Sequence, residues 1–323
     1  MSVVTGLHHV TAIAGDPQEN LDFYAGRLGM RLVKRSVNQD VPGTYHLFYA
    51  DGAGHPGSDL TFFPWPDMLP GRQGVGHTVE VGLAVPPGSL NWWHSRLRDS
   101  GTALQPIETR FGERVLPLHD PHGLPVALVE TADPREFTPW DGSPVPTDGQ
   151  VRGLHGVRLL ERQLAPTATF LADGLGFRLV AEESGWRRYA VGDGGSGRVL
   201  DLRASAEAPR GEWGVGSVHH IAWRVPDDAA ELLAQRRILE AGRRPTEVID
   251  RFWFKSVYFT EPGGALFEVA TDGPGFGVDE APEELGTALV LPPWLERQRA
   301  VIEAGLPPLR MPAAPAGTPS GTR

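Results

Sequence analysis

The first half of this chain is repeated in its second half. GLHHVTAIAGDPQENLDFYAGRLGMRLV begins at Gly6 and aligns without a gap with GLHGVRLLERQLAPTATFLADGLGFRLV, which begins at Gly153, and 11 of 28 positions are identical. A weaker pair, VGLAVPPGSLNWW from Val81 and IAWRVPDDAAELL from Ile221, leads to an acid-Pro-x-Gly turn in both halves. A repeat of this kind restricts the chain to a fold built from one duplicated unit.

The chain divides into four units, near residues 6–64, 74–131, 153–204 and 216–271. Each opens with a short strand of alternating apolar residues, continues into an amphipathic helix, and ends in two or three strands joined by Gly/Pro turns. This order predicts an α+β fold of four βαβββ modules in two tandem domains. The expected divisions are an N-terminal domain over 1–135, a linker over 136–152 rich in Pro, Gly and acids, a C-terminal domain over 153–275, and a terminal helix with a disordered tail over 276–323.

Composition narrows the chemistry. The 323 residues include no cysteine, which excludes thiolate metal sites and a cysteine nucleophile, so any metal must be held by histidines and carboxylates. A net charge of −10 repels a phosphate backbone, and nucleic acid is not expected as a partner. The sequence has no basic leader and no apolar run near the ~20 residues of a membrane span, which predicts a cytoplasmic protein without a membrane partner. It leaves the oligomeric state open, a homo-oligomer being one alternative.

Two histidine doublets and one carboxylate are the candidate metal ligands. His8-His9 and His219-His220 each lie on the opening strand of a module, and Glu268 lies in the middle of an apolar strand, ALFEVAT. Because successive strand side chains face opposite ways, one histidine of each doublet is expected in the site and the other behind the sheet. A buried carboxylate needs a cation or donors, and two histidines with one carboxylate form the facial triad of non-haem Fe(II) oxygenases.

The repeat supplies an internal control for these ligands. His9 aligns with Gly156, and Glu268 aligns with Ala127, so modules two and three lack them. The triad His9, His220 and Glu268 therefore predicts that modules one and four pack together around the metal. Two other interpretations stay open: each histidine is a hydrogen-bonded core residue, or Glu268 pairs with a neighbouring cation, Arg251 or Lys255.

Three further residues are expected near the metal. Tyr258 lies across the last hairpin from Glu268 if the loop around Gly263 has an odd number of residues. Thr11 shares a strand face with His9, and Arg251 begins the hairpin strand, where it could attract an anionic phenolate. A purely structural role for each is an equal alternative.

The motifs GLHHVTAI, VPGTYHLFYADGAGHPGSDLTFFP, GSVHHIAWRV and TEPGGALFEVA resemble the vicinal oxygen chelate superfamily, which groups glyoxalases, bleomycin resistance proteins and extradiol dioxygenases. Within it they resemble the hydroquinone-type ring-cleaving branch, over nearly the whole chain to about Asp272. The resemblance implies an Fe(II) enzyme of aromatic hydrocarbon catabolism that opens a hydroquinone ring with O₂, Mn(II) being the alternative metal. It implies His9, His220 and Glu268 as ligands.

The same resemblance implies catalytic roles for His8, Thr11, His219, Arg251 and Tyr258, with His219, His8 or Tyr258 as acid or base. Two other functions share this fold. A glyoxalase-like isomerase or lyase would use the metal as a Lewis acid and usually has a second carboxylate ligand, for which no well-placed acid is apparent. A drug-sequestering binding protein would need no metal, which the retained triad argues against.

Overall fold

A computed structural model describes residues 2–311, and its strands form two eight-stranded sheets. The first sheet has the order β14 (Ile249–Asp250), β15 (Lys255–Thr260), β16 (Leu266–Thr271), β13 (Val218–Val225), β1 (Leu7–Ala14), β4 (Asp59–Pro64), β3 (Tyr45–Ala50) and β2 (Arg31–Val37). The second has the order β10 (Arg178–Glu183), β11 (Trp186–Ala190), β12 (Val199–Ala204), β9 (Gly153–Glu161), β5 (His77–Val85), β8 (Pro125–Glu130), β7 (Glu113–His119) and β6 (Glu108–Arg110).

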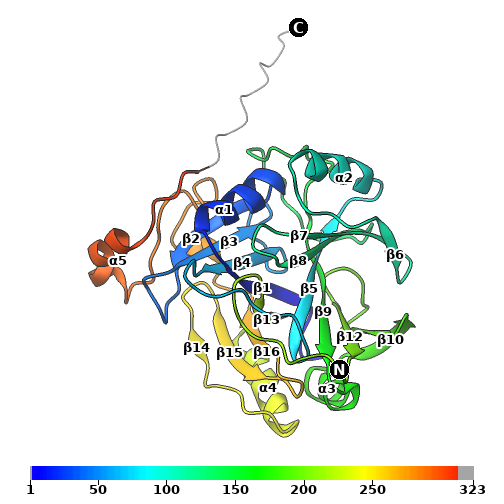
Figure 1. Cartoon of the computed structure of the whole chain (residues 1–323). Coiled ribbons are helices and arrows are strands. Elements are labelled where there is room, and N and C mark those ends of the chain that lie inside the picture. The colour runs from blue at the N-terminus through cyan, green and yellow to red at the C-terminus, as the bar shows by residue number, and fades with distance from the viewer. Residues whose placement is uncertain (1, 312–323) are drawn as a thin grey trace.

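Each sheet combines one module from each half of the chain. In the first sheet, β1 of module one pairs antiparallel with β13 of module four, and Figure 1 shows these distant segments side by side near the centre of the molecule. In the second, β5 of module two pairs with β9 of module three. The predicted α+β fold and the pairing of modules one and four are thus confirmed. The sheets cut across the division into residues 1–135 and 153–275, whose boundaries stay a prediction.

The helical segments are short. They are α1 (Pro17–Leu21), η1 (Asp22–Arg27), α2 (Leu90–Asp99), α3 (Leu164–Phe170), η2 (Leu171–Leu175), α4 (Asp228–Glu240), η3 (Phe276–Val278), η4 (Glu296–Gln298) and α5 (Arg299–Gly305). Polar caps fix two of their starts: the Asp16 side chain accepts from the Gln18 and Glu19 amides before α1, and the Asp227 side chain accepts from the Ala230 amide before α4. No described helix is both long and apolar enough to cross a bilayer.

Apolar contacts hold the helices against the sheets. Tyr24 of η1 is fully buried, with its ring centroid 4.4 Å from that of Phe62 in β4 and 5.3 Å from that of Tyr49 in β3. Each such aromatic side chain buries enough apolar surface to contribute roughly 2 kcal/mol or more. This packing fixes the position of β4 beside β1, the strand that carries the first histidine doublet.

The segment after residue 275 packs back onto the first sheet. Lys34 in β2 is fully buried, and its ammonium group bonds Asp279, at 2.6 Å, and Glu280. The Ser36 hydroxyl in the same strand donates to the Val290 carbonyl oxygen at 2.7 Å. The terminal helix expected from the sequence is present as α5 beyond this segment (Figure 1). Most of the tail expected to be disordered, residues 312–323, lies outside the described residues.

Candidate metal centre

Three buried donors converge where β1, β13 and β16 meet. The Nε2 atoms of His9 and His220 lie 3.2 Å apart, and the Glu268 Oε2 atom lies 3.3 Å from the first and 3.0 Å from the second. All three side chains are at most 5 % exposed. Among the residues that the structure describes, this is the one group of three or more metal-binding side chains whose ligand atoms are close enough to share an ion.

The spacing of these donors fits one metal ion. Bonds of about 2.1 Å at right angles place neighbouring ligand atoms about 3 Å apart, which matches the three separations. Glu268 Oε2 is buried and has no hydrogen-bond partner among the described residues, so a cation would satisfy it. Burial opposes the charge on Glu268, but the facing His9 and His220 outweigh burial and hold the pKa of the carboxyl well below its usual range.

Both histidines of each doublet lie on the same side of the sheet, which corrects the expectation that one would lie behind it. In the β1–β13 ladder, Leu7 lies opposite Trp223 and His9 lies opposite Ala222, so His8 has no partner on β13. Farther along, Thr11 lies opposite His220 and Ala12 lies opposite Val218, so His219 has no partner on β1. His8 and His219 are therefore the extra residues of two β-bulges. A bulge breaks the strict alternation of side chains and redirects them, so His219 and His220 line one cavity.

A backbone carbonyl sets the tautomer of the first doublet. His8 Nε2 lies 3.1 Å from the Thr271 carbonyl oxygen, which can only accept, so His8 Nε2 carries the proton. Burial, then the His9 charge, lowers the pKa of His8 to about 3, so the ring is neutral and its Nδ1 accepts from His9 Nδ1, 2.9 Å away. His9 Nε2 is then left with the lone pair that a metal requires.

The second doublet has the same contact. His219 Nδ1 lies 2.8 Å from His220 Nδ1, and burial, then the His220 charge, lowers the pKa of His219 to about 3. If His220 Nε2 binds a metal, its Nδ1 carries the proton and donates it to His219. The neutral His219 ring then carries its own proton on Nε2. The indole of Trp213 stacks on this ring at 4.8 Å and fixes its plane.

The alternative partners of Glu268 are occupied elsewhere. Lys255 pairs with Asp228 at 2.5 Å, and Arg251 pairs with Asp40 at 3.1 Å. Glu268 instead accepts from the Ser256 hydroxyl, 2.5 Å from its Oε1 atom. The interpretation in which Glu268 pairs with Arg251 or Lys255 is therefore wrong, because these cations reach carboxylates at the rim.

Tyr258 lies directly opposite Glu268 in the β15–β16 pair, as the loop-length argument requires. Its ring is 5.8 Å from that of His220, and its hydroxyl accepts from Arg251 Nε at 3.3 Å. Burial raises the pKa of Tyr258 well above its usual value, which keeps the hydroxyl protonated. Thr11 does not line the cavity beside these groups, and its hydroxyl bonds that of Thr61 at 2.7 Å.

His9 and His220 line a cavity of about 350 Å³. Its wall is mainly aromatic, and the sequence argument did not identify these residues: His46, Phe48, Phe63, Trp65, Trp253 and Phe254. His46 Nε2 bonds the Thr61 hydroxyl at 2.9 Å, which links the wall to Thr11. Burial, then the charges of His9 and His220, holds the pKa of His46 well below its usual value. The alternation of side chains along YHLFYA and DLTFFPW could have indicated part of this wall. His46 and Phe48 share one face of their strand, and Phe63 and Trp65 are likewise two residues apart.

Paired βαβββ modules with a buried two-histidine, one-carboxylate site define a class of metal-dependent enzyme folds. The chain belongs to the Glyoxalase/Bleomycin resistance protein/Dioxygenase superfamily, whose family model matches residues 6–126 and 153–269.

Three relatives match along almost their whole length. A Bacillus subtilis (strain 168) protein, MhqO, described as a ring-cleaving dioxygenase, is 44% identical over 307 residues, covering 95% of this chain and 97% of its own. A chlorohydroquinone/hydroquinone 1,2-dioxygenase of Sphingobium indicum is 32% identical over 301 residues, covering 91% and 93%. A crystal structure described as a dioxygenase from Bacillus subtilis superposes with a TM-score of 0.91 at 41% identity, covering 97% and 99%.

Proposed function

We propose that this protein is a ring-cleaving dioxygenase that opens the aromatic ring of a hydroquinone with O₂, using Fe(II) held by His9, His220 and Glu268. The observation that carries the proposal is the convergence of these three buried donors beside an aromatic cavity. The names of the full-length relatives support the ring-cleaving class and the hydroquinone substrate. Fe(II) and cleavage beside a ring hydroxyl rest on the family resemblance, because the donor set equally suits Mn(II).

The cavity fits one planar ring. Its aromatic wall would stack on the substrate and exclude water, while His219 and Tyr258 present polar groups beside the ligands. When bound, the metal would supply a Lewis acid and a path for electrons between the ring and O₂. The protein's own part is to orient the ring and to move the proton of its hydroxyl.

His219 and Tyr258 are the proposed proton-handling residues. The pKa of His219, about 3, makes the ring neutral at ordinary pH. With Nδ1 accepting from His220, the ring carries its proton on Nε2, so it would donate that proton to a substrate oxygen as an acid. The Tyr258 hydroxyl accepts from Arg251 and so keeps its own proton free to donate to a substrate oxygen. His8 and Thr11 would act by orienting: His8 fixes the His9 tautomer, and Thr11 supports His46 through Thr61.

Protein loaded anaerobically with Fe(II) should consume O₂ when hydroquinone is added, and the ring absorbance should be lost in step. Glu268→Ala should abolish both signals and lower the iron content measured by elemental analysis. Glu212→Gln, which changes an exposed acid paired with Arg72 at 2.5 Å, is the control for loss of one negative charge. Oxygen uptake in Glu268→Ala equal to that of the unchanged protein would refute the ligand assignment.

The same assay separates the proposal from the glyoxalase-like alternative. An isomerase or lyase with a Lewis-acid metal would consume no O₂ and would work equally with a redox-inert ion such as Zn²⁺. Loading with Zn²⁺ should therefore give no ring loss. Loading with Mn(II) in place of Fe(II) tests the metal, and the ion that supports faster oxygen uptake is the cofactor.

A further inference from the structure

The hairpin that carries Arg251 has a counterpart in the other sheet. Arg251-Phe252 follows β14, and Arg110-Phe111 ends β6 and begins the turn to β7, at the same place in their modules. Both phenylalanines have a positive φ, 75° at Phe252 and 51° at Phe111, which is strained for an aromatic residue. The two hairpins thus share one backbone geometry. They present an arginine at the same point of the two eight-stranded sheets, each of which forms a half-barrel.

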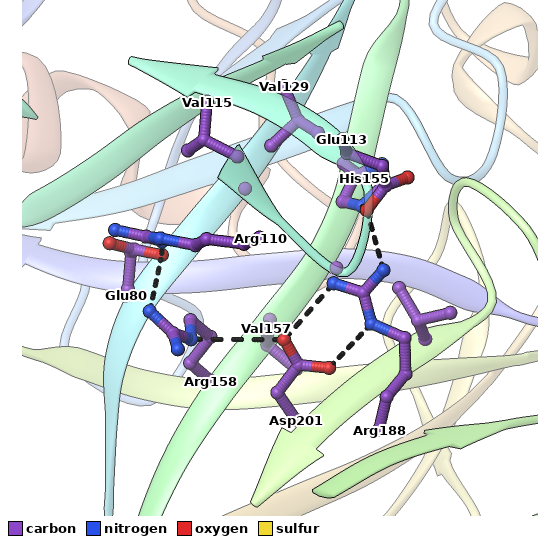
Figure 2. Close-up of a pocket in the computed structure, with 13 residues that line it drawn as sticks. Glu80, Arg110, Glu113, Val115, Val129, His155, Val157, Arg158, Arg188 and Asp201 are labelled. Atoms are coloured by element: carbon purple, nitrogen blue, oxygen red, sulfur yellow. Dashed lines mark hydrogen bonds and ion pairs between the residues drawn. The ribbon is translucent and has the colours of Figure 1, made fainter. Parts of the chain in front are cut away.

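In the second sheet, this arginine holds a carboxylate inside the half-barrel. Arg110 Nη1 lies 2.5 Å from Glu80 Oε1, and the two side chains are only 16 % and 13 % exposed (Figure 2). In the β5–β9 ladder Glu80 lies opposite Arg158, which aligns with Thr11 in the repeat. In the β13–β1 ladder the residue opposite Thr11 is His220. Glu80 therefore occupies the position of a metal ligand, and the space around it is reduced to about 20 Å³.

In the first sheet, the arginine is turned to a carboxylate at the rim. Arg251 Nη1 and Nη2 lie 3.3 and 3.1 Å from the two oxygens of Asp40, whose side chain is 73 % exposed. Asp40 belongs to the loop between β2 and β3, residues 38–44. The equivalent connection in the second sheet, between β10 and β11, is only residues 184–185. The second half-barrel thus lacks this loop, and the outer carboxylate of its arginine, Glu108 at 2.6 Å, comes from β6 itself while Arg110 also binds inward to Glu80.

The Asp40 loop is held in place by its own contacts. The Asn38 side chain is buried and accepts from the backbone amides of Asp40 and Val41. The Gln39 side-chain amide donates to the Arg251 carbonyl oxygen at 2.9 Å. Gln39, Asp40 and Val41 all line the cavity above the metal ligands. The Asp40 carboxylate is therefore a fixed negative charge at the cavity, opposite the positively charged side chain that faces it.

Building on the proposed function, we propose that Asp40 is a specificity-determining residue that excludes carboxylated rings from the cavity. Arg251 is the one arginine in the cavity wall of the described structure, and Asp40 occupies a bidentate edge of its guanidinium. A ring carboxylate would have to displace Asp40 and approach its charge. The substrates selected are hydroquinones whose substituents are uncharged. The Arg110–Glu80 pair shows the contact that Arg251 would offer a carboxylate inside the half-barrel without Asp40.

The test compares two ligands that differ by one carboxylate, hydroquinone and 2,5-dihydroxybenzoate. Binding of each to the Fe(II)-loaded protein is measured by calorimetry without O₂, and turnover is measured with an oxygen electrode. Asp40→Asn removes the charge and keeps the shape. It should shift the ratio of the two Kd values, and the ratio of kcat/KM values, toward 2,5-dihydroxybenzoate by about tenfold or more, since one close charge pair is worth about that factor.

Two further variants isolate the cause. Glu212→Gln makes the same change in net charge far from the cavity and should leave both ratios unchanged. Adding Arg251→Gln to Asp40→Asn should remove the gain in 2,5-dihydroxybenzoate binding, because the carboxylate then has no guanidinium to bind. If Asp40→Asn folds poorly, Asp40→Ala serves, and circular dichroism identifies the usable variant.

The outcomes separate this inference from the proposed function. Absence of oxygen uptake with either ligand, together with the shifted Kd ratio, would refute the dioxygenase proposal and support the role of Asp40. Oxygen uptake with hydroquinone, together with an unshifted Kd ratio in Asp40→Asn, would support the dioxygenase proposal and refute the role of Asp40. Equal shifts in Glu212→Gln and Asp40→Asn would overturn the inference, because the effect would then be one of net charge.

Discussion

The two oxygens of the Glu268 carboxylate have different partners. Oε2 faces His9 and His220, whereas Oε1 accepts from the buried Ser256 hydroxyl at 2.5 Å. A hydrogen bond to the far oxygen fixes the plane of the carboxylate and leaves Oε2 free for a metal ion. Ser256 is thus the residue that orients the only acidic ligand of the triad.

We expect Ser256→Ala to weaken metal binding without removing a ligand. Loss of a hydrogen bond that orients a ligand typically costs about 10- to 100-fold in metal affinity. Titration of the metal-free protein with Mn(II), followed by electron paramagnetic resonance of the free ion, measures this directly. Ser36→Ala is the matched control, because Ser36 is equally buried in β2 but donates to the Val290 carbonyl oxygen. Equal affinities for Ser256→Ala and the unchanged protein would contradict the orienting role.

The sequence singled out the proposed ligand residues because their chemistry stands out in apolar strands. His9, His220 and Glu268 are polar residues in strands that are otherwise buried, and the repeat showed that modules two and three lack His9 and Glu268 at the aligned positions. Asp40 carried no such signal, because an acid in a Pro/Gly-containing loop is ordinary on any surface. Its role depends on reaching Arg251, 211 positions away, and only tertiary structure shows that contact.

At the scale of elements, strand order was easier to predict than local strand geometry. The paired modules and the Tyr258↔Glu268 register follow from repeat and turn lengths. The bulges at His8 and His219 do not, because a bulge is one extra residue in a ladder and leaves no mark in composition. The second sheet has bulges at the aligned positions, where the β5–β9 register shifts between Gly82 and Leu83 and between Thr78 and Glu80. The bulges therefore belong to the repeated fold and do not depend on the histidines.

A pair of carboxylates connects the end of β9 to the β15–β16 turn. Glu161 is fully buried and its oxygens have no hydrogen-bond partner among the described residues. Glu261 in the turn accepts from the amides of Gly263, Gly264 and Ala265 and from the Thr167 hydroxyl. Burial, then the charge of Glu261, raises the pKa of Glu161 to about 8.

This pair predicts a loss of stability as pH rises from about 4.5 to about 8. Between the ordinary value of 4.5 and about 8, the folded protein keeps a proton on Glu161 that the unfolded chain has released. The unfolding free energy therefore falls as pH rises through this window, by at most about 1.4 kcal/mol per pH unit. Urea unfolding between pH 6.5 and 8.5 should show this fall in the unchanged protein and a flatter profile in Glu161→Gln. Parallel profiles would contradict the raised pKa.

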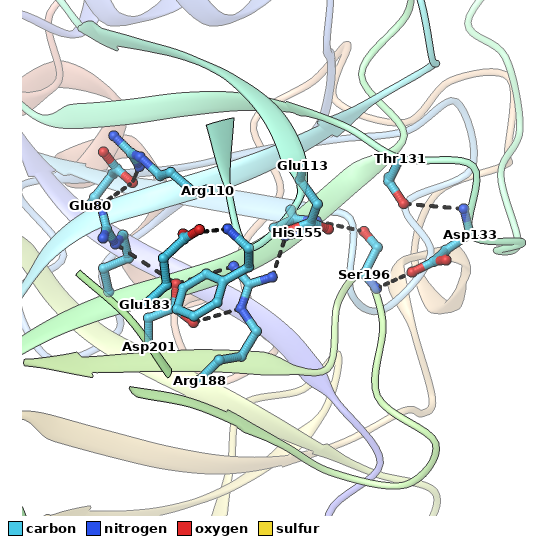
Figure 3. A network of polar contacts seen from close by, with 12 residues as sticks. Glu80, Arg110, Glu113, Thr131, Asp133, His155, Glu183, Arg188, Ser196 and Asp201 are labelled. Carbon is cyan, nitrogen blue, oxygen red and sulfur yellow. Dashed lines mark hydrogen bonds and ion pairs between the residues drawn. The ribbon is translucent and has the colours of Figure 1, made fainter. Parts of the chain in front are cut away.

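At the scale of the whole molecule, two similar half-barrels have opposite contents. The second is filled by a network of ion pairs (Figure 3): Arg188 lies 2.8 Å from Asp201 and 2.5 Å from Glu113, and Arg110 bonds Glu80. Arg188 also covers the Phe111 ring at 4.2 Å, which closes the network beneath the hairpin. Three arginines, including Arg158, face three carboxylates there, so the charges balance without a bound ion.

The asymmetry predicts one metal ion per chain in spite of the repeat. In the second half-barrel, Gly156 and Ala127 replace two ligands, and Glu80, at the position of the third, is neutralised by Arg110. At the aligned positions a metal would have one donor, Glu80, and the other acids of this space, Glu113 and Asp201, are paired with Arg188. Elemental analysis of protein saturated with Fe(II) or Mn(II) and then desalted should give one equivalent, and Glu268→Ala should give close to none.

The decisive comparison weakens each half-barrel in turn. Glu80→Gln removes the aligned acid of the second half-barrel and should leave one equivalent bound, while costing stability because Arg110 and Arg158 lose their buried partner, about 3–5 kcal/mol for a fully buried pair and less at this partial exposure. Glu268→Ala should have the opposite effect, losing the metal but keeping the fold. Two equivalents in the unchanged protein would show a second metal site and contradict the prediction. One equivalent retained in Glu268→Ala and lost in Glu80→Gln would place the metal in the second half-barrel and contradict it as well. One equivalent lost only with Glu268 would mean that the two half-barrels share their bulges and their arginine hairpin, while a metal site is present in one of them alone.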